Sequence, residues 1–372
     1  MKQPIYLQVD GTTYYNELLA RYVSYQTGKN IKFYCYSQEK DLLNWLVEPS
    51  ESLDELMLAE AIRIRNSVEY LILSWSGGTD SNTIYNIFVR NNIHIDEIVV
   101  WYDEVDSIAY PKDHAEWLVK NHPDPTTIIS PRDRFDPVSK SKMVNNDDWI
   151  WQNTAMIARL NLAVADVPMQ EYCQKQANGR TWCLLNGQEQ PEVYSEDGVW
   201  YATHNTRTYR NVMGFDNSIC FYALPNLTLK QAHMAKNALK MMGKTKIGDG
   251  GWTFGPRTTA EYQYWATCIG RHPELNPGRS YQQKRFEVQI DYLSIKPDSI
   301  DGELTAPSDS HLTRLIQQDH SLVKTFQNGI RNVLYEKDFC DYLIETSSRS
   351  HINVVGKNVG AKITSNRWCL GR

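Results

Sequence analysis

The stretch YLILSWSGGTDSNTIYNIF, residues 70–88, constrains the fold more than any other part of the sequence. Its apolar start, Tyr70 to Ser74, predicts a buried strand. After the turn, Ile84, Ile87 and Phe88 have the spacing of one face of a helix. The two glycines and the small hydroxyl residues between these segments add little to a hydrophobic core. A strand that ends in such a turn and continues directly into a helix predicts a β–α connection of a parallel sheet.

The same alternation of strand and helix continues along the chain. Ser52 and Glu55 have the spacing of a capping box and predict the start of a helix before the first strand of this pattern. Further strands are predicted at residues 98–101, 126–129 and 181–185, and further helices at 113–120 and 149–177. Strands that alternate with helices in this way predict an α/β fold, in which a twisted parallel sheet carries helices on both faces.

The ends of the chain have a different pattern, and we expect three parts. Residues 1–51, with short strand candidates at 5–9 and 31–36, form an N-terminal extension. The α/β domain covers residues 52–225. Residues 226–372 form a C-terminal substrate or lid region that is mostly helical. It contains an amphipathic helix that includes Leu229, a glycine-rich tract at 243–255, a strand candidate at 286–292 and helices within 311–345.

Composition and charge argue against several classes of protein. The 372 residues carry a formal net charge of −5, which argues against a nucleic-acid partner. The seven cysteines are scattered without a C-x-x-C pair, which argues against a zinc ribbon, an iron–sulfur site or a disulfide framework. No apolar run reaches the roughly 18 residues that a membrane-spanning helix needs. The N-terminus lacks the apolar segment of a signal peptide. We therefore expect a cytoplasmic protein without a membrane partner.

The turn after the first strand has the composition of an anion-binding site: Ser76-Gly77-Gly78-Thr79-Asp80-Ser81. Its two glycines let the backbone approach phosphate oxygens, and the N–H groups and dipole of the following helix point at the same charge. Its three hydroxyl groups are further donors. Asp80 would repel a phosphate unless a divalent cation bridges the two. The turn therefore predicts a nucleotide with Mg²⁺, and the alternative is a plain loop whose Thr or Asp caps the helix.

The string SGGTDS resembles the SGGxDS signature of the PP-loop ATP pyrophosphatases, a superfamily with a Rossmann-like sheet. The resemblance covers roughly residues 60–225. It implies that ATP is cleaved between its α and β phosphates, that a carbonyl or carboxyl oxygen is adenylated, and that a nucleophile then displaces AMP. It also implies which residues grip pyrophosphate and which one helps to hold Mg²⁺: Ser76, Gly77, Gly78, Thr79 and Ser81 for the first role, and Asp80 for the second.

The second informative string is LLNGQEQPE, residues 184–192, where a predicted strand ends in a turn with two carboxylates. Its position is similar to that of the glycine turn with acidic residues in asparagine-synthetase-like enzymes, whose carboxylate shares the Mg²⁺. By this resemblance Glu189 or Glu192 is a second metal ligand, and a solvated acidic turn is the alternative. Residue 2 is lysine, so the cysteine nucleophile of the glutamine-dependent members is missing, and residues 1–50 are too short for a glutaminase domain.

Several other charged residues are candidates for the site. Lys230, near the start of the helix after the α/β domain, contacts phosphate by the same resemblance, and a solvent-facing lysine is the alternative. Three further groups could contact substrate or phosphate, each against the alternative of an ordinary loop: Asp103, Glu104 and Asp106 after the second strand, His204 and Arg207, and Lys244 and Lys246 in the glycine-rich tract.

Together these features predict an ATP-dependent ligase or amidotransferase-like enzyme that forms AMP and pyrophosphate, with ATP and Mg²⁺ as cofactors and Asp80 and Lys230 as catalytic residues. The acceptor is a small-molecule or peptide-borne carboxylate, and the nucleophile is ammonia or another amine. Two alternatives stay open: a sulfonucleotide enzyme of the same fold that resembles the 3′-phosphoadenylyl-sulfate reductases, and a nucleotide-binding protein without turnover. The sequence does not identify the acceptor, the amine donor or the oligomeric state.

Overall fold

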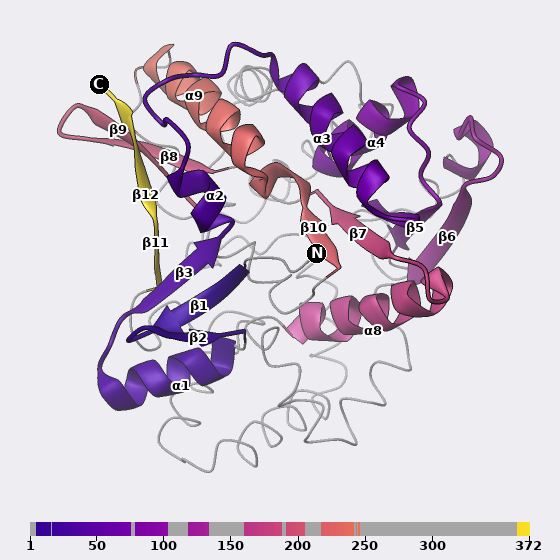
Figure 1. The fold of residues 1–372 in the computed structure, drawn as a ribbon, viewed down its shortest axis with the longest axis horizontal. Coiled ribbons are helices and arrows are strands. Elements are labelled where there is room, and N and C mark those ends of the chain that lie inside the picture. The colour runs from indigo at the N-terminus through magenta and orange to yellow at the C-terminus, as the bar shows by residue number, and fades with distance from the viewer. Residues whose placement is uncertain are drawn as a thin grey trace, which may run out of the picture.

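The computed structural model describes residues 5–15, 17–75, 79–102, 118–133, 160–187, 191–204, 217–241, 243, 245 and 363–372 of the chain. These residues form three sheets and the helices that pack on them (Figure 1). We name the sheets the N-terminal sheet, the parallel sheet and the C-terminal sheet.

The N-terminal sheet has the strand order β11-β3-β1-β2. Its strands are β1 (Ile5–Val9), β2 (Thr12–Tyr14), β3 (Ile31–Cys35) and β11 (Ile363–Ser365), and helix α1 (Glu17–Thr27) connects β2 to β3. β1 pairs antiparallel with both β2 and β3, whereas β11 pairs parallel with β3. The short helix α2 (Ser37–Asp41) follows β3 directly.

The parallel sheet has five strands in the order β10-β7-β4-β5-β6, and all four pairings are parallel. Its strands are β4 (Tyr70–Trp75), β5 (Glu97–Tyr102), β6 (Ile128–Asp133), β7 (Trp182–Asn186) and β10 (Ser218–Cys220). Helices α3 (Leu53–Ser67), α4 (Thr79–Arg90) and α8 (Leu160–Ala177) flank it. The predicted α/β fold with a parallel sheet is therefore confirmed, and it is compatible with a Rossmann-like core.

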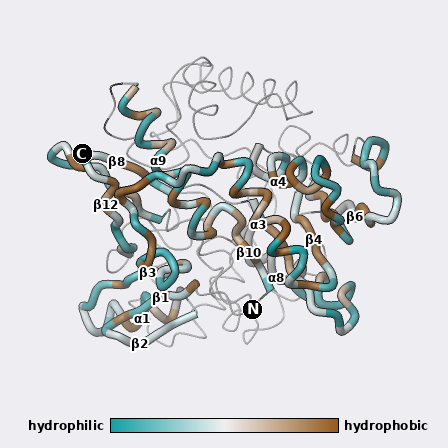
Figure 2. Tube along the Cα trace, turned by 45° about the horizontal axis from the view of Figure 1, so that its top comes forward, coloured by the Kyte–Doolittle hydropathy of each residue, from teal (hydrophilic) through white to brown (hydrophobic). Residues whose placement is uncertain are grey.

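The two faces of β4 pack against different helices, because successive side chains of a strand point to opposite faces. Leu71 and Leu73 belong to the hydrophobic core that includes α3 and α4. Ile72 belongs to a second core with Met169 and Cys173 of α8. Figure 1 shows α3 and α4 on one side of the sheet and α8 on the other. In Figure 2 the segments along β4 are hydrophobic and many of the outer turns are hydrophilic.

The C-terminal sheet is antiparallel and has the order β12-β9-β8. Its strands are β8 (Glu192–Glu196), β9 (Val199–Thr203) and β12 (Arg367–Gly371). A 3₁₀ helix (Phe221–Ala223) and helix α9 (Pro225–Met241) follow β10. Trp45 and Trp368 stack with ring centroids 4.5 Å apart, and they share a core with residues of α9.

Most of the predicted elements in the described ranges are present, with ends that differ by a few residues. The predicted capping box is also present: the Ser52 side chain accepts from the Glu55 backbone N–H and the Glu55 side chain accepts from the Ser52 backbone N–H. The third strand differs most, because β6 begins at Ile128 rather than at Thr126. Asp124 explains the difference, since its side chain accepts from the backbone N–H of Thr126 and holds that residue in a turn.

The C-terminal region is described only at its two ends. The sequence predicts that it is mostly helical, and α9 is a helix at its start. The end of the chain, however, forms β11 and β12, which pair with β3 and β9 and so join the first and last segments of the sequence. Strand pairing between such distant segments depends on partners that local periodicity does not reveal. The strand predicted at 286–292 and the helices within 311–345 lie outside the described residues.

Candidate functional site

The carboxyl ends of three strands lie at one edge of the parallel sheet. Ser74 of β4 pairs with Asn186 of β7, and Asn186 pairs with Cys220 of β10. Neighbouring strands are about 4.8 Å apart. The segments that follow Trp75 and Asn186 therefore begin beside each other. These segments contain the two strings that the sequence singles out.

The strand order makes this edge a topological switch point. From β4 the chain runs through α4 to β5 and then to β6 on one side. It returns through α8 to β7, which lies on the other side of β4. In open α/β sheets, ligands bind in the crevice at the carboxyl ends of the strands where the order reverses. The switch point between β4 and β7 is therefore the candidate site.

Helix α4 begins at Thr79, immediately after the two glycines of the predicted turn. Its N-terminal end consequently lies at the carboxyl edge, where its unpaired N–H groups and its dipole favour an anion. Thr79 and Asp80 are in the first turn of this helix. Ser76, Gly77 and Gly78, together with the side chains of Thr79 and Asp80, lie outside the described part of the chain.

The first turns of α4 are polar and also buried. Ser81, Asn82 and Thr83 are 4%, 2% and 5% exposed. The indole Nε1–H of Trp75 donates to Oδ1 of Asn82 over 2.7 Å, and the Nδ2 group of Asn86 donates to the Asn82 carbonyl over 2.9 Å. Ser81 is the one residue of the SGGTDS segment whose side chain the structure describes.

The second predicted turn is described only at its two ends. β7 ends at Asn186, and residues 188–190, which include Glu189, lie outside the described residues. Glu192 is exposed and is the first residue of β8, where it pairs with Thr203 of the C-terminal sheet. Glu189 and Glu192 as metal ligands therefore remain predictions. In the described residues no group of three or more His, Cys, Asp or Glu side chains is arranged to hold a metal ion.

Lys230 lies in α9, and its ammonium contacts a carboxylate and a backbone carbonyl. Its Nζ is 2.8 Å from Oε1 of Glu48 and donates to the carbonyl of Pro49 over 2.9 Å. These contacts tie α9 to the segment before α3, so a contact with phosphate would require Lys230 to leave its ion pair. Its catalytic role remains a prediction.

His204, a candidate substrate contact, is only 1% exposed and lies between the sheets. Its Nε2 is 3.5 Å from Nζ of Lys40, and its ring packs edge-on against Phe33 and Trp368. Burial lowers the pKa of His204 well below its ordinary value, and Lys40 lowers it further. The remaining candidates lie outside the described ranges: Asp103, Glu104, Asp106, Arg207, Lys244 and Lys246.

Lys40 is a residue that the sequence analysis missed. It is fully buried, and burial lowers its pKa from 10.5 to about 8. No ion pair joins its ammonium to a carboxylate of the described chain. Its Nζ lies 3.5 Å from Nε2 of His204, and the ring centroids of Tyr36 and Trp368 are 5.7 and 5.9 Å away. Tyr36, which precedes α2, has a left-handed φ of 50°, an unfavourable conformation for a bulky residue. No local pattern marks a lysine in a short polar helix as buried.

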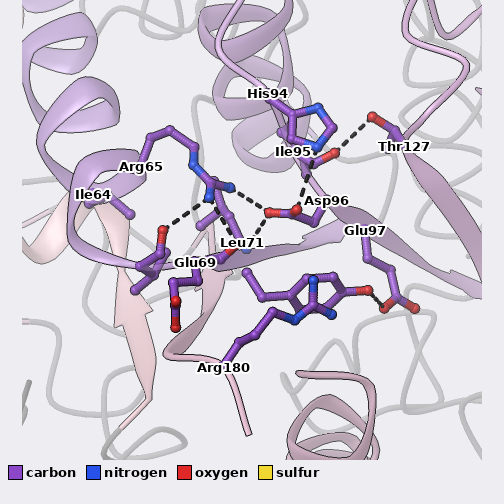
Figure 3. Close-up of polar contacts among 12 residues, drawn as sticks. Ile64, Arg65, Glu69, Leu71, His94, Ile95, Asp96, Glu97, Thr127 and Arg180 are labelled. Atoms are coloured by element: carbon purple, nitrogen blue, oxygen red, sulfur yellow. Dashed lines mark hydrogen bonds and ion pairs between the residues drawn. The ribbon is translucent and has the colours of Figure 1, made fainter. Parts of the chain in front are cut away.

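The opposite, amino edge of the sheet holds a dense polar network (Figure 3). Asp96 accepts from Arg65 over 2.5 Å and from the Leu71 backbone N–H over 2.8 Å. Glu97 is fully buried and accepts from the hydroxyls of Tyr70, Ser130 and Tyr172 over 2.8, 2.6 and 2.5 Å. Arg180 packs over the Tyr70 ring at 4.0 Å. Because every carboxylate in this network has strong donors, the network explains stability rather than ligand binding.

Comparisons with known proteins assign this chain to no family. No protein-family model matches the chain, and no curated protein matches it. In the part of the chain that the structure describes, no helix is both long and apolar enough to cross a bilayer.

Proposed function

We propose that this protein binds ATP with Mg²⁺ at the switch point between β4 and β7 and cleaves it to AMP and pyrophosphate. One observation carries the proposal: the SGGTDS and NGQEQ segments follow neighbouring parallel strands that pair through Ser74 and Asn186. Two segments more than a hundred residues apart thereby start at the same edge of the sheet. A phosphate-binding turn and an acidic turn with that relationship have the chemistry needed for a nucleotide and its cation.

Each group of residues has a role in this proposal. The backbone N–H groups of residues 76–79 and the N-terminal end of α4 would bind phosphate oxygens, since a helix N-terminus offers unpaired donors to an anion. Asp80 and Glu189, with Glu192 as an alternative, would hold Mg²⁺. The ion, when bound, neutralises phosphate charge and stabilises the pyrophosphate that leaves.

The reaction that we propose has two steps. A carboxylate oxygen of the acceptor attacks the α-phosphorus of ATP, and the bond from this phosphorus to the bridging oxygen breaks, which releases pyrophosphate. An amine then attacks the activated carbonyl carbon, AMP leaves with the electron pair of the C–O bond, and the nitrogen loses a proton. Catalysis of this kind depends mainly on positioning and on fixed donors at the phosphates.

The experiment measures ATP binding by calorimetry and product formation by ion chromatography, in both cases with and without Mg²⁺. The wild type should bind ATP only with Mg²⁺ and should form AMP and pyrophosphate slowly with water as the acceptor. Asp80→Asn should weaken binding by about tenfold or more, since it removes a cation ligand. Asp54→Asn, in the first turn of α3, is the matched control and should bind as the wild type does.

Three results would contradict the proposal. Absence of ATP binding by the folded wild type would exclude a nucleotide site at this edge. Binding without AMP formation would leave a nucleotide-binding protein without turnover. Consumption of 3′-phosphoadenylyl sulfate in place of ATP would favour the sulfonucleotide alternative.

A further inference from the structure

The predicted phosphate-binding turn is bracketed by a hydrogen-bonded pair. Trp75 is the residue before the SGGTDS segment and Asn82 is the residue after it. The Trp75 indole donates to the Asn82 side chain over 2.7 Å, and both residues are 2% exposed. We call this pair the turn clamp.

The turn clamp joins the two residues that flank the SGGTDS segment. Glycine loses more backbone entropy on ordering than any other residue, and two glycines lie between the paired residues. A hydrogen bond shielded from water is stronger than an exposed one, because water does not compete for donor or acceptor. The clamp therefore fixes the end of β4 relative to the start of α4 across the turn.

Both halves of the clamp are anchored in the fold. Trp75 belongs to the core that includes Ile84 and Phe88 of α4. The carbonyl of Asn82 accepts from the Asn86 side chain one turn further along the same helix. A displacement of either residue would consequently change the spacing between strand and helix, and with it the direction of the backbone N–H groups at the turn.

We propose that Trp75 and Asn82 are positioning residues, which hold the turn in the shape that binds the phosphates of a nucleotide. This inference rests on the proposed function. Binding energy depends on preorganisation, since a site that is ordered before binding loses less entropy when the ligand arrives. The clamp should therefore contribute to nucleotide affinity although neither side chain contacts the nucleotide.

The experiment compares Trp75→Phe, Asn82→Leu and the double variant with the wild type. Urea unfolding measures stability, and calorimetry measures the Kd for α,β-methylene-ATP with Mg²⁺. Each single variant should weaken binding about tenfold, because a loss of about 1.4 kcal/mol is one factor of ten in Kd. The double variant should regain stability relative to Asn82→Leu, since the buried indole N–H is no longer left without its Asn82 acceptor. Its affinity should stay low.

Trp45→Phe is the matched control. Trp45 is 6% exposed, and its indole donates to the Lys40 carbonyl over 2.8 Å, so the variant removes a similar buried hydrogen bond outside the turn. It should lose stability and keep its affinity. An affinity within twofold of the wild type in Trp75→Phe, or an affinity that follows stability in all variants, would overturn the clamp. Failure of the wild type to bind the analogue would overturn the proposed function first.

Discussion

The two edges of the parallel sheet differ in the polar and charged side chains that they hold and in how these are paired. At the amino edge, Asp96 and Glu97 are held by Arg65, by hydroxyl groups and by a backbone N–H. At the carboxyl edge, α4 begins with the buried polar residues Ser81, Asn82 and Thr83. Lys40, in the separate helix α2, is buried without a carboxylate partner in the described chain. A protein tolerates such costs mainly where it binds or reacts, so the difference separates the edge that stabilises from the edge that we expect to function.

The largest effect on stability is expected when Asp96 is removed from the polar network at the amino edge. Asp96→Ala should lower the free energy of unfolding by about 3–5 kcal/mol, because it leaves the partly buried Arg65 without its carboxylate partner. The Leu71 backbone N–H also loses its side-chain acceptor. Urea denaturation measures the loss. Nucleotide affinity should remain unchanged, and a loss of affinity without a loss of stability would reverse the assignment of the two edges.

An exposed ion pair is the control for that prediction. Arg367 pairs with Glu196, and these side chains are 42% and 56% exposed. Exposed pairs contribute about 0–1 kcal/mol, so Glu196→Ala should lie within that range. A similar loss of stability in Asp96→Ala and Glu196→Ala would mean that the buried network at the amino edge contributes no more than an exposed ion pair.

The next largest effect is expected at Lys40, where a substitution should raise the free energy of unfolding rather than lower it. Its pKa is about 8 in the folded protein and 10.5 ordinarily, so the unfolded chain holds one more proton between these values. Stability should consequently rise with pH from about 8 to 10.5, by about 3 kcal/mol in total. Lys40→Met removes the penalty and should raise the free energy of unfolding at pH 7 by up to about 3 kcal/mol.

The difference between wild type and Lys40→Met isolates this residue from other groups that titrate in the same range. Burial raises the pKa of the Cys35 thiol, for example, to about 11. The control is Lys230→Met, which removes a lysine that has a carboxylate partner, Glu48, and should not stabilise the protein. A pH-independent difference between wild type and Lys40→Met would contradict the burial of this ammonium.

The smallest effect is expected at the start of α3, the helix that leads into β4. Ser52→Ala removes the capping box and should cost about 1 kcal/mol of stability. Ser50→Ala, two residues earlier and outside the cap, should be neutral. Equal losses would mean that the cap contributes nothing of its own. Circular dichroism during urea unfolding measures both.

The sequence predicts the α/β part of the fold well because its signals are local. Tyr70 to Trp75 and Glu97 to Tyr102 are short apolar runs, and the spacing of Ile84 and Phe88 defines one face of α4. The pairing of the chain end with β3 was not predictable in this way. Its three residues gain their stability from a partner more than three hundred positions away, and no local pattern identifies that partner.

The residues of the candidate site show the same difference between features that local sequence signals predict and features that they do not. The glycine turn and its place between a strand and a helix follow from the sequence, because glycine and hydroxyl residues have local backbone preferences. His204 and Glu192, two residues singled out from sequence, lie in the C-terminal sheet or against its core rather than in the described part of the switch point. Lys40 and the Trp75–Asn82 pair were not singled out at all.

The sequence by itself determined that this chain alternates strands and helices, and that a glycine-rich segment with three hydroxyl residues lies between one strand and its helix. Only the tertiary structure decided that β7 lies beside β4 and that the two distinctive segments start at one edge. It also decided which polar side chains are buried. The physical reason is range: periodicity and turn chemistry act over a few residues, whereas strand order and desolvation depend on parts of the chain that meet only after folding.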